Sequence, residues 1–208
     1  MQRHGFWRGC AALTVLLLVC ACSSLDVDES DAGELFVEGR IRKELNRAEN
    51  GTSTHLELAW ISVQGEEGPL EYAIDTLTFG AHVDLPFGTQ GRFGIGGGLA
   101  WQANDIDIAP IDVEDENGLG PYIDVDCGWL PVHWLEPYAR ANVAALLNEV
   151  STLAAFELGA RVHAVEHATF YAAWRHAWYE MDDVDSDVGV STIELDVSGL
   201  VVGVLLSF

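Results

Sequence analysis

From residue 53 to the C-terminus, polar and apolar residues alternate in segments of about ten residues. Clusters of Gly, Pro, Asn and Asp separate the segments. No segment has the 3.6-residue period and the capping residues of an amphipathic helix. The pattern predicts strands near 54–64, 71–85, 91–103, 120–129, 136–147, 153–165, 168–180 and 194–208, and a further strand-like piece near 35–44. We therefore expect an all-β protein.

The two faces of the predicted strands differ in character. Between residues 92 and 104, Phe93, Ile95 and Leu99 share one face, while Arg92 and several glycines share the other. In a soluble sandwich the polar face would meet water and carry Lys, Thr and Glu. Small residues mixed with isolated charges suit instead the narrow lumen of a barrel whose outer face is apolar.

The predicted connections alternate in length. Those at 86–90, 130–134 and 165–167 are tight, whereas those at 65–69, 104–118, 148–152 and 181–191 are longer or more acidic. This layout is typical of an antiparallel up-and-down transmembrane β-barrel. We expect eight strands, an even number, with residues 35–45 outside the barrel; ten strands is the alternative, in which this segment joins the sheet.

Composition adds two constraints. The 208 residues are 49% hydrophobic, with a mean hydropathy of +0.15, yet they carry 33 acidic and ten basic residues and a formal charge of -23. An acidic disordered tail would be poorer in apolar residues, and a nucleic-acid partner would require clustered Lys and Arg. A lipid-facing surface with acidic loops accounts for both properties.

The N-terminus reads as a signal peptide over residues 1–21, because a short basic start precedes an apolar run too short to span a membrane. Val19-Cys20-Ala21-Cys22 resembles a bacterial lipobox, which implies lipidation of Cys22; an ordinary cleaved secretory signal is the alternative. Residues 22–33 form an acidic tether, and residues 34–208 are the expected barrel domain. Cys127 is then left without a disulfide partner in the mature chain.

The final stretch, 200–208, has alternating apolar residues and ends on Phe208. It resembles the C-terminal strand of small bacterial outer-membrane β-barrel proteins. The resemblance implies a place in the cell outer membrane among lipid and lipopolysaccharide. It also implies that Phe208 is the signal read by the outer-membrane assembly machinery.

Charged residues fall on the expected lumen side of several strands. They are Glu57, Asp124, Asp126, Glu157, Arg92, Arg140, Arg161 and Arg175. Buried charges must be matched, and an eight-stranded barrel has room only for side chains. We expect a structural plug of ion pairs without an open channel; a gated pore or polar site is the alternative.

The acidic stretch 180–194 offers a candidate calcium loop. Asp183, Asp185, Asp187 and Glu194 match the ligand spacing of an EF-hand-like loop, but the position that requires glycine carries Val188. We expect a solvated loop, with calcium binding or divalent bridging to lipopolysaccharide as alternatives. No other cofactor is expected.

Enzymatic activity is not expected. The lipid A deacylase family places His and Ser two residues apart on a late strand, but here His176 is followed by Trp178 at that position. The expected function is therefore a non-enzymatic outer-membrane barrel that serves envelope structure or surface binding. Two alternatives are a lipid-anchored, lipocalin-like soluble barrel that binds an apolar ligand and a lipid-modifying enzyme.

Aromatic residues near the predicted strand ends suggest an interfacial girdle. They are Trp60, Trp101, Trp129, Trp134, Trp174, Trp178, Tyr138 and Tyr179.

Overall fold

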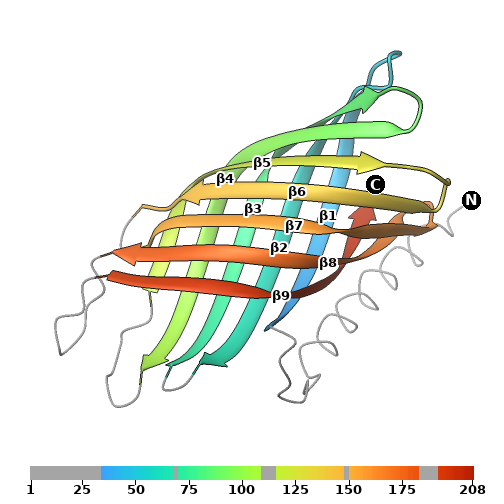
Figure 1. Cartoon of the computed structure of the whole chain (residues 1–208). Coiled ribbons are helices and arrows are strands. Elements are labelled where there is room, and N and C mark those ends of the chain that lie inside the picture. Colours follow the sequence, from blue (N-terminus) through green and yellow to red (C-terminus); the bar gives the residue numbers. More distant parts are fainter. Residues whose placement is uncertain (1–33, 68–69, 109–115, 148–149, 183–191) are drawn as a thin grey trace, which may run out of the picture.

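The protein is a closed β-barrel of nine strands (Figure 1). The computed structural model describes residues 34–67, 70–108, 116–147, 150–182 and 192–208. The strands are β1 (Glu34–Arg47), β2 (Ser53–Glu67), β3 (Leu70–Phe87), β4 (Gly91–Ile108), β5 (Glu116–Trp129), β6 (Leu135–Ala145), β7 (Val150–Val165), β8 (Ala168–Asp182) and β9 (Thr192–Ser207). Within these residues there is no helix long and apolar enough to cross a membrane.

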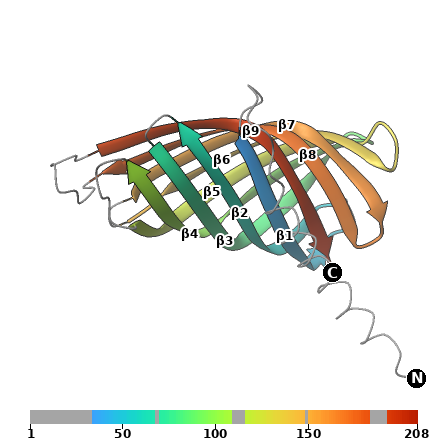
Figure 2. The ribbon, with the colours of Figure 1, turned by 90° about the horizontal axis from the view of Figure 1, so that it is seen from below.

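The all-β barrel is confirmed, but the expected strand count of eight or ten is wrong. The extra strand is β1, which pairs antiparallel with β2 and parallel with β9. Figure 2 shows β1 lying between these two strands. An even count follows only if every neighbour is antiparallel, and the parallel β1–β9 seam removes that condition. Glu38, Arg40 and Arg42 alternate along β1 and bury their side chains inside the barrel.

The parallel seam places the two ends of the barrel chain at opposite ends of the barrel. Glu34 pairs with Gly199 and Arg42 with Ser207, and the Phe208 amide donates a hydrogen bond to the Arg42 carbonyl (2.9 Å). The chain therefore enters β1 at the end where β4 leads to β5 and β8 leads to β9. It finishes at the end that carries the tight turns, where Gly51 and Gly88 have positive φ angles of 86° and 64°.

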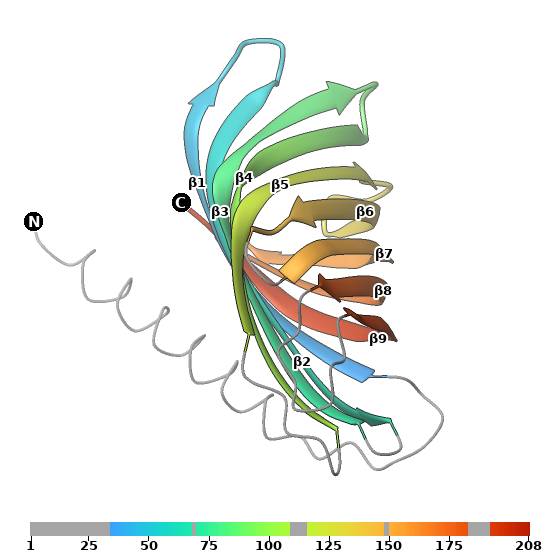
Figure 3. The same cartoon turned by 90° about the vertical axis from the view of Figure 1, so that its left-hand side faces the viewer.

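The outer surface of the barrel is apolar. The strands run obliquely around the barrel (Figure 3). Because each strand is pleated, alternate side chains point outward. Large hydrophobic side chains are exposed on every strand from β1 to β9. Examples are Ile41, Leu58, Phe79, Leu99, Ile123, Val143, Leu158, Trp174 and Leu200.

Most of the expected girdle residues lie on this outer surface, and two do not. Trp101, Trp129 and Trp174 are exposed. Tyr138 and Tyr179 are 3% and 2% exposed and point into the lumen, so their assignment to the girdle is wrong. Each falls on the inward phase of its strand, and this phase decides burial more directly than closeness to a strand end.

The lumen is filled by side chains in two zones. An apolar zone occupies the half nearer the β4–β5 and β8–β9 connections, and it includes Phe36, Ile61, Val63, Tyr72, Ile74, Ala100, Ile106, Leu153, Tyr179 and Val197. A charged zone occupies the half nearer the tight turns. The zones meet at a cavity of about 30 Å³, lined in part by Glu38, Tyr122, Arg140 and Arg175. Such a volume holds a few water molecules at most.

The β1–β9 seam can be tested by cross-linking. Ile41 and Leu206 are direct partners in the register, and neighbouring strands lie at about the Cα separation that a disulfide needs. In a Cys127→Ser background, Ile41→Cys with Leu206→Cys should form an intramolecular disulfide on mild oxidation, detected by mass spectrometry. The control pair, Ile41→Cys with Leu200→Cys, is displaced by six residues and should not. Equal yields from the two pairs would disprove the register.

Candidate functional site

The charged zone of the lumen forms one continuous ion-pair network. It contains seven carboxylates and six arginines, namely Glu38, Glu57, Asp84, Asp124, Asp126, Glu136, Glu157, Arg40, Arg42, Arg92, Arg140, Arg161 and Arg175. All of them are buried except Arg92, whose side chain is 18% exposed. The formal charge of the network is therefore -1, and -22 of the -23 lies outside it.

Arg92 organises the part of the network nearest the tight turns. Its guanidinium contacts Asp84, lies 2.5 Å from Asp126 Oδ2 and lies 2.9 Å from Glu136 Oε1. Arg161 contacts the last two carboxylates from the other side, at 3.1 and 2.8 Å. Strands β3, β4, β5, β6 and β7 are tied together at this level, because these five residues come from five consecutive strands.

A second group lies deeper in the barrel. Arg140 donates from Nε to Asp124 Oδ2 (2.6 Å) and from Nη1 to Glu38 Oε1 (3.2 Å). Arg175, 2% exposed, donates to Glu157 Oε1 at 2.6 Å. The Arg140 contact with Glu38 joins β6 to β1 across the lumen, so β1 is held by side chains as well as by its backbone pairing.

Arg42 joins Asp84 of the first group to Glu57, and Glu57 Oε1 lies 3.8 Å from Arg40, which pairs with Glu38 of the second group. Arg42 donates from Nε and Nη2 to Glu57 Oε2 (2.8 and 2.5 Å), and its Nη1 lies 3.3 Å from Asp84 Oδ2. The flat guanidinium can serve several acceptors at once, which an ammonium cannot do in a fixed plane. This geometry explains why arginine rather than lysine fills the lumen.

Three aromatic rings pack against lumen arginines, and one of these contacts is between Arg175 and Phe36, at 5.5 Å. The guanidinium carbon of Arg161 lies 4.0 Å from the ring centroid of Tyr138, and that of Arg40 lies 5.5 Å from Tyr171. Cation–π contacts of this kind compensate part of the loss of hydration.

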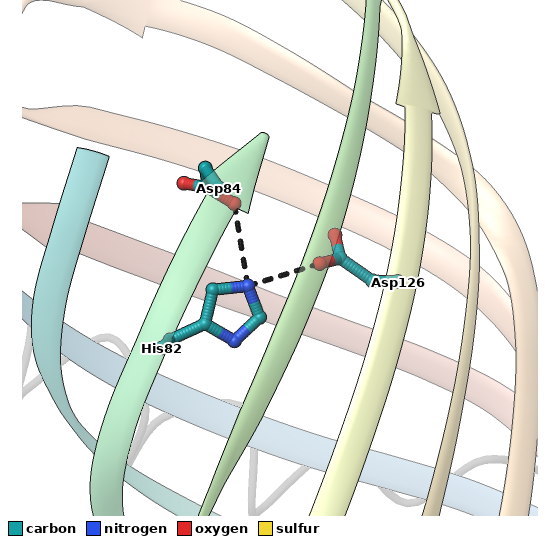
Figure 4. Close-up of side chains that lie close together, drawn as sticks. All are labelled: His82, Asp84 and Asp126. Atoms are coloured by element: carbon teal, nitrogen blue, oxygen red, sulfur yellow. Dashed lines mark ion pairs between the residues drawn. The ribbon is translucent and has the colours of Figure 1, made fainter. Parts of the chain in front are cut away.

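His82 is surrounded by three carboxylates, two of which, Asp84 and Asp126, are drawn in Figure 4. Its Nδ1 lies 3.1 Å from Asp124 Oδ1, and its Nε2 lies 3.2 Å from both Asp84 Oδ1 and Asp126 Oδ1. A positive charge on this ring would bring the network to neutrality. His82 therefore belongs to the charge balance of the lumen.

His82, Asp84 and Asp126 also have the composition of a metal site, with ligand atoms within 4.8 Å of one another. Both carboxylates, however, already accept hydrogen bonds from Arg92. A bound cation would have to displace that guanidinium. The donor set therefore fits an ion-pair cluster better than a metal centre.

Glycines on the lumen face of β4 make room for His82. A Cβ at Gly94 would lie 2.0 Å from Asp126 Oδ1 and 2.3 Å from His82 Nε2, and one at Gly96 would lie 2.5 Å from Asp124 Oδ1. Any larger residue there would overlap the ring and its partners. The glycine-rich stretch 94–98 thus creates the space in which β3 and β5 side chains meet across β4.

The structure brings all eight of the lumen residues named from sequence into the network. Five further charged members, namely Glu38, Arg40, Arg42, Asp84 and Glu136, were not named. The first three lie on β1, where charged and uncharged residues alternate over residues 38–42. Asp84 and Glu136 lie close to tight turns. Near a turn, an acidic residue in the sequence can equally well belong to the exposed turn or to the lumen face of the strand.

The other residues named from sequence lie apart from this network. Cys22, Asp183, Asp185 and Asp187 lie outside the described residues, and Glu194 is exposed on β9. Phe208 is 53% exposed and stacks on His167 with a centroid distance of 6.2 Å. A scan of protein-family models and a comparison with curated proteins found no match to this chain.

Removing one lumen arginine should be far more damaging than removing an exposed one. Arg140→Met keeps the bulk but leaves Asp124 without its arginine and Glu38 with Arg40 as its close cation, which we expect to cost about 3–5 kcal/mol in the free energy of unfolding. Arg47→Met, the control, breaks an exposed pair with Glu44, in which Arg47 is 63% exposed. It should leave the urea midpoint nearly unchanged. Similar losses in the two variants would contradict the proposed importance of the lumen pairs.

The steric role of the β4 glycines gives a second test. Gly94→Ala should lower stability by about 1–3 kcal/mol, because its methyl group would collide with His82 and Asp126. Gly39→Ala is the matched control, since a Cβ there has nothing within 4 Å. It should be neutral or slightly stabilising, because alanine restricts the unfolded chain. Thermal unfolding followed by circular dichroism measures both, and equal destabilisation would refute the space-making role.

Proposed function

We propose that this protein is a barrel of the bacterial outer membrane, with its apolar outer surface in lipid and a solid, non-conducting lumen. Its role would be structural or surface-binding within the envelope. The proposal comes from the polarity of the barrel, in which buried charges fill the inside while large apolar side chains are exposed on the outside. Partners of this body would be membrane lipid and lipopolysaccharide.

The inverted polarity is the observation that carries the proposal. Exposed apolar patches beyond a few hundred Å² are rare on soluble monomers and mark surfaces that meet a membrane or another protein. Here such residues occur on all nine strands rather than in one patch. A continuous belt suits lipid, which surrounds a protein, better than a partner that covers one side. A lipocalin-like carrier would need the opposite arrangement.

The packed lumen argues against transport as the function. Within the described part of the chain, ion pairs fill the half nearer the tight turns. Mainly apolar side chains fill the other half, together with the buried Thr76, Gln102 and Asn104. Small barrels of this kind have interiors wide enough only for their own side chains. The arginines would have to leave their carboxylates before a solute could pass.

The remaining charge gives the two ends of the barrel different surroundings. Because the network is nearly neutral, the negative charge of the chain resides outside it, and many of these acids occur in the stretches that join β4 to β5 and β8 to β9. β1 begins at this same end.

A charged substitution on the outer surface tests insertion. Leu158 is 60% exposed at the middle of β7, and Val165 is 65% exposed at the end of the same strand. In a bilayer, Leu158→Arg should cost about 2–4 kcal/mol and Val165→Arg about 0–1 kcal/mol. Reversible urea unfolding from phospholipid vesicles measures the difference.

The same pair of variants distinguishes the soluble alternative. On a water-exposed surface, Leu158→Arg should change stability by no more than about 0.5 kcal/mol. A value that small, together with failure of the wild-type protein to enter vesicles, would overturn the proposal.

A further inference from the structure

Three polar side chains form a cluster on the outer surface of the barrel, away from the lumen network. His176 on β8 and Ser198 on β9 are direct partners across the two strands, and His176 Nδ1 is hydrogen-bonded to Ser198 Oγ. Asp196 Oδ1 lies 3.3 Å from the same nitrogen. The imidazole also packs edge to face on Trp178, with ring centroids 4.0 Å apart.

The surroundings of this cluster are apolar. Phe156, the partner of His176 on β7, is 44% exposed, and Trp174 and Leu200 are 50% and 46% exposed on the same outward phase. Polar side chains facing lipid are costly and are commonly functional. The lumen network does not use these three residues, and no turn or barrel closure requires them.

We propose that Ser198 and His176 form a nucleophile–base pair that hydrolyses a carboxylic ester linking an acyl chain to an amphiphile in the surrounding membrane. A serine hydroxyl becomes nucleophilic when an adjacent imidazole can take its proton. The inference rests on the proposed membrane insertion, because insertion brings this face into contact with lipid. The residue two positions after His176 on β8 is Trp178, so the sequence of that strand shows no serine. The proposed nucleophile, Ser198, comes from the neighbouring strand β9.

The chemistry balances with water as the second reactant. Ser198 Oγ attacks the ester carbonyl carbon while its proton passes to His176 Nδ1, and that proton then goes to the departing alkoxide oxygen as the ester C–O bond breaks. Water next attacks the acyl-serine carbonyl and gives its proton to Nδ1, which returns it to Oγ as the fatty acid leaves. Asp196 is a positioning residue, because its carboxylate stabilises the imidazolium that forms in each half.

The class of substrate follows from the neighbours. Phe156, Trp174 and Leu200 offer an apolar surface on which an acyl chain can lie beside the serine. Asp196, whose side chain is 62% exposed, disfavours an anionic group immediately at the scissile bond. The substrate is therefore an amphiphile with a neutral carboxylic ester.

The experiment uses the full chain folded in detergent micelles, with p-nitrophenyl hexanoate and a fluorophosphonate fluorophore as probes. The wild type should hydrolyse the ester and be labelled on Ser198. Ser198→Ala should abolish labelling, and His176→Asn should reduce both labelling and hydrolysis at least about 100-fold. Ser62→Ala is the control, because Ser62 also lies on the outward phase of its strand but has no histidine as its strand partner; it should retain full activity.

Asp196→Asn should lower kcat with little change in KM, and Asp196→Glu should restore part of the rate. If Asp196 only supported the fold, its substitution would not lower kcat selectively while leaving KM unchanged. Absence of labelling in the wild type, or activity that survives Ser198→Ala, would overturn the inference. The esterase assay uses micelles and a soluble ester, so it does not require insertion into vesicles. Absence of activity would therefore overturn the proposed hydrolysis without bearing on the Leu158→Arg test of membrane insertion.

Discussion

The structure depends on the matching of charges inside a narrow barrel. Ions removed from water are stable only when each is paired and hydrogen-bonded, and loss of one partner leaves the other exposed to the full desolvation cost. Six of the ten basic residues of the chain lie in the lumen, each against one to three carboxylates. Because its members come from strands β1 to β8, the network forms fully only when these strands are assembled around the lumen.

Other features follow from this constraint. Most of the lumen arginines pair with two or three carboxylates, and His82 and its partners need space beside them. Glycines on the lumen face of β4 provide that space. With the charged side chains inside, the outward phase is left to apolar residues. The negative charge of the chain is then found outside the network, which explains how one sequence can be strongly acidic and hydrophobic together.

The outward cluster of His176, Ser198 and Asp196 departs from this division. Cross-strand pairing creates the contact between His176 and Ser198, which stand 22 residues apart in the chain. An antiparallel ladder can therefore assemble a nucleophile and a base on a surface where neither strand alone shows a motif. The proposed activity and the proposed membrane placement meet at this face, since lipid would supply the substrate.

The sequence by itself determined the strands, their inward and outward phases and eight members of the charged network, because alternation with a period of two is a local property of the chain. It did not determine the strand count, since whether β1 joins the sheet depends on a parallel edge formed with β9, more than 150 residues away. The alternation of Glu38, Arg40 and Arg42 is visible in the sequence, but their place in the lumen follows only once β1 joins the sheet. The pairing of His176 with Ser198 was likewise hidden, because register between strands is decided only when the barrel closes.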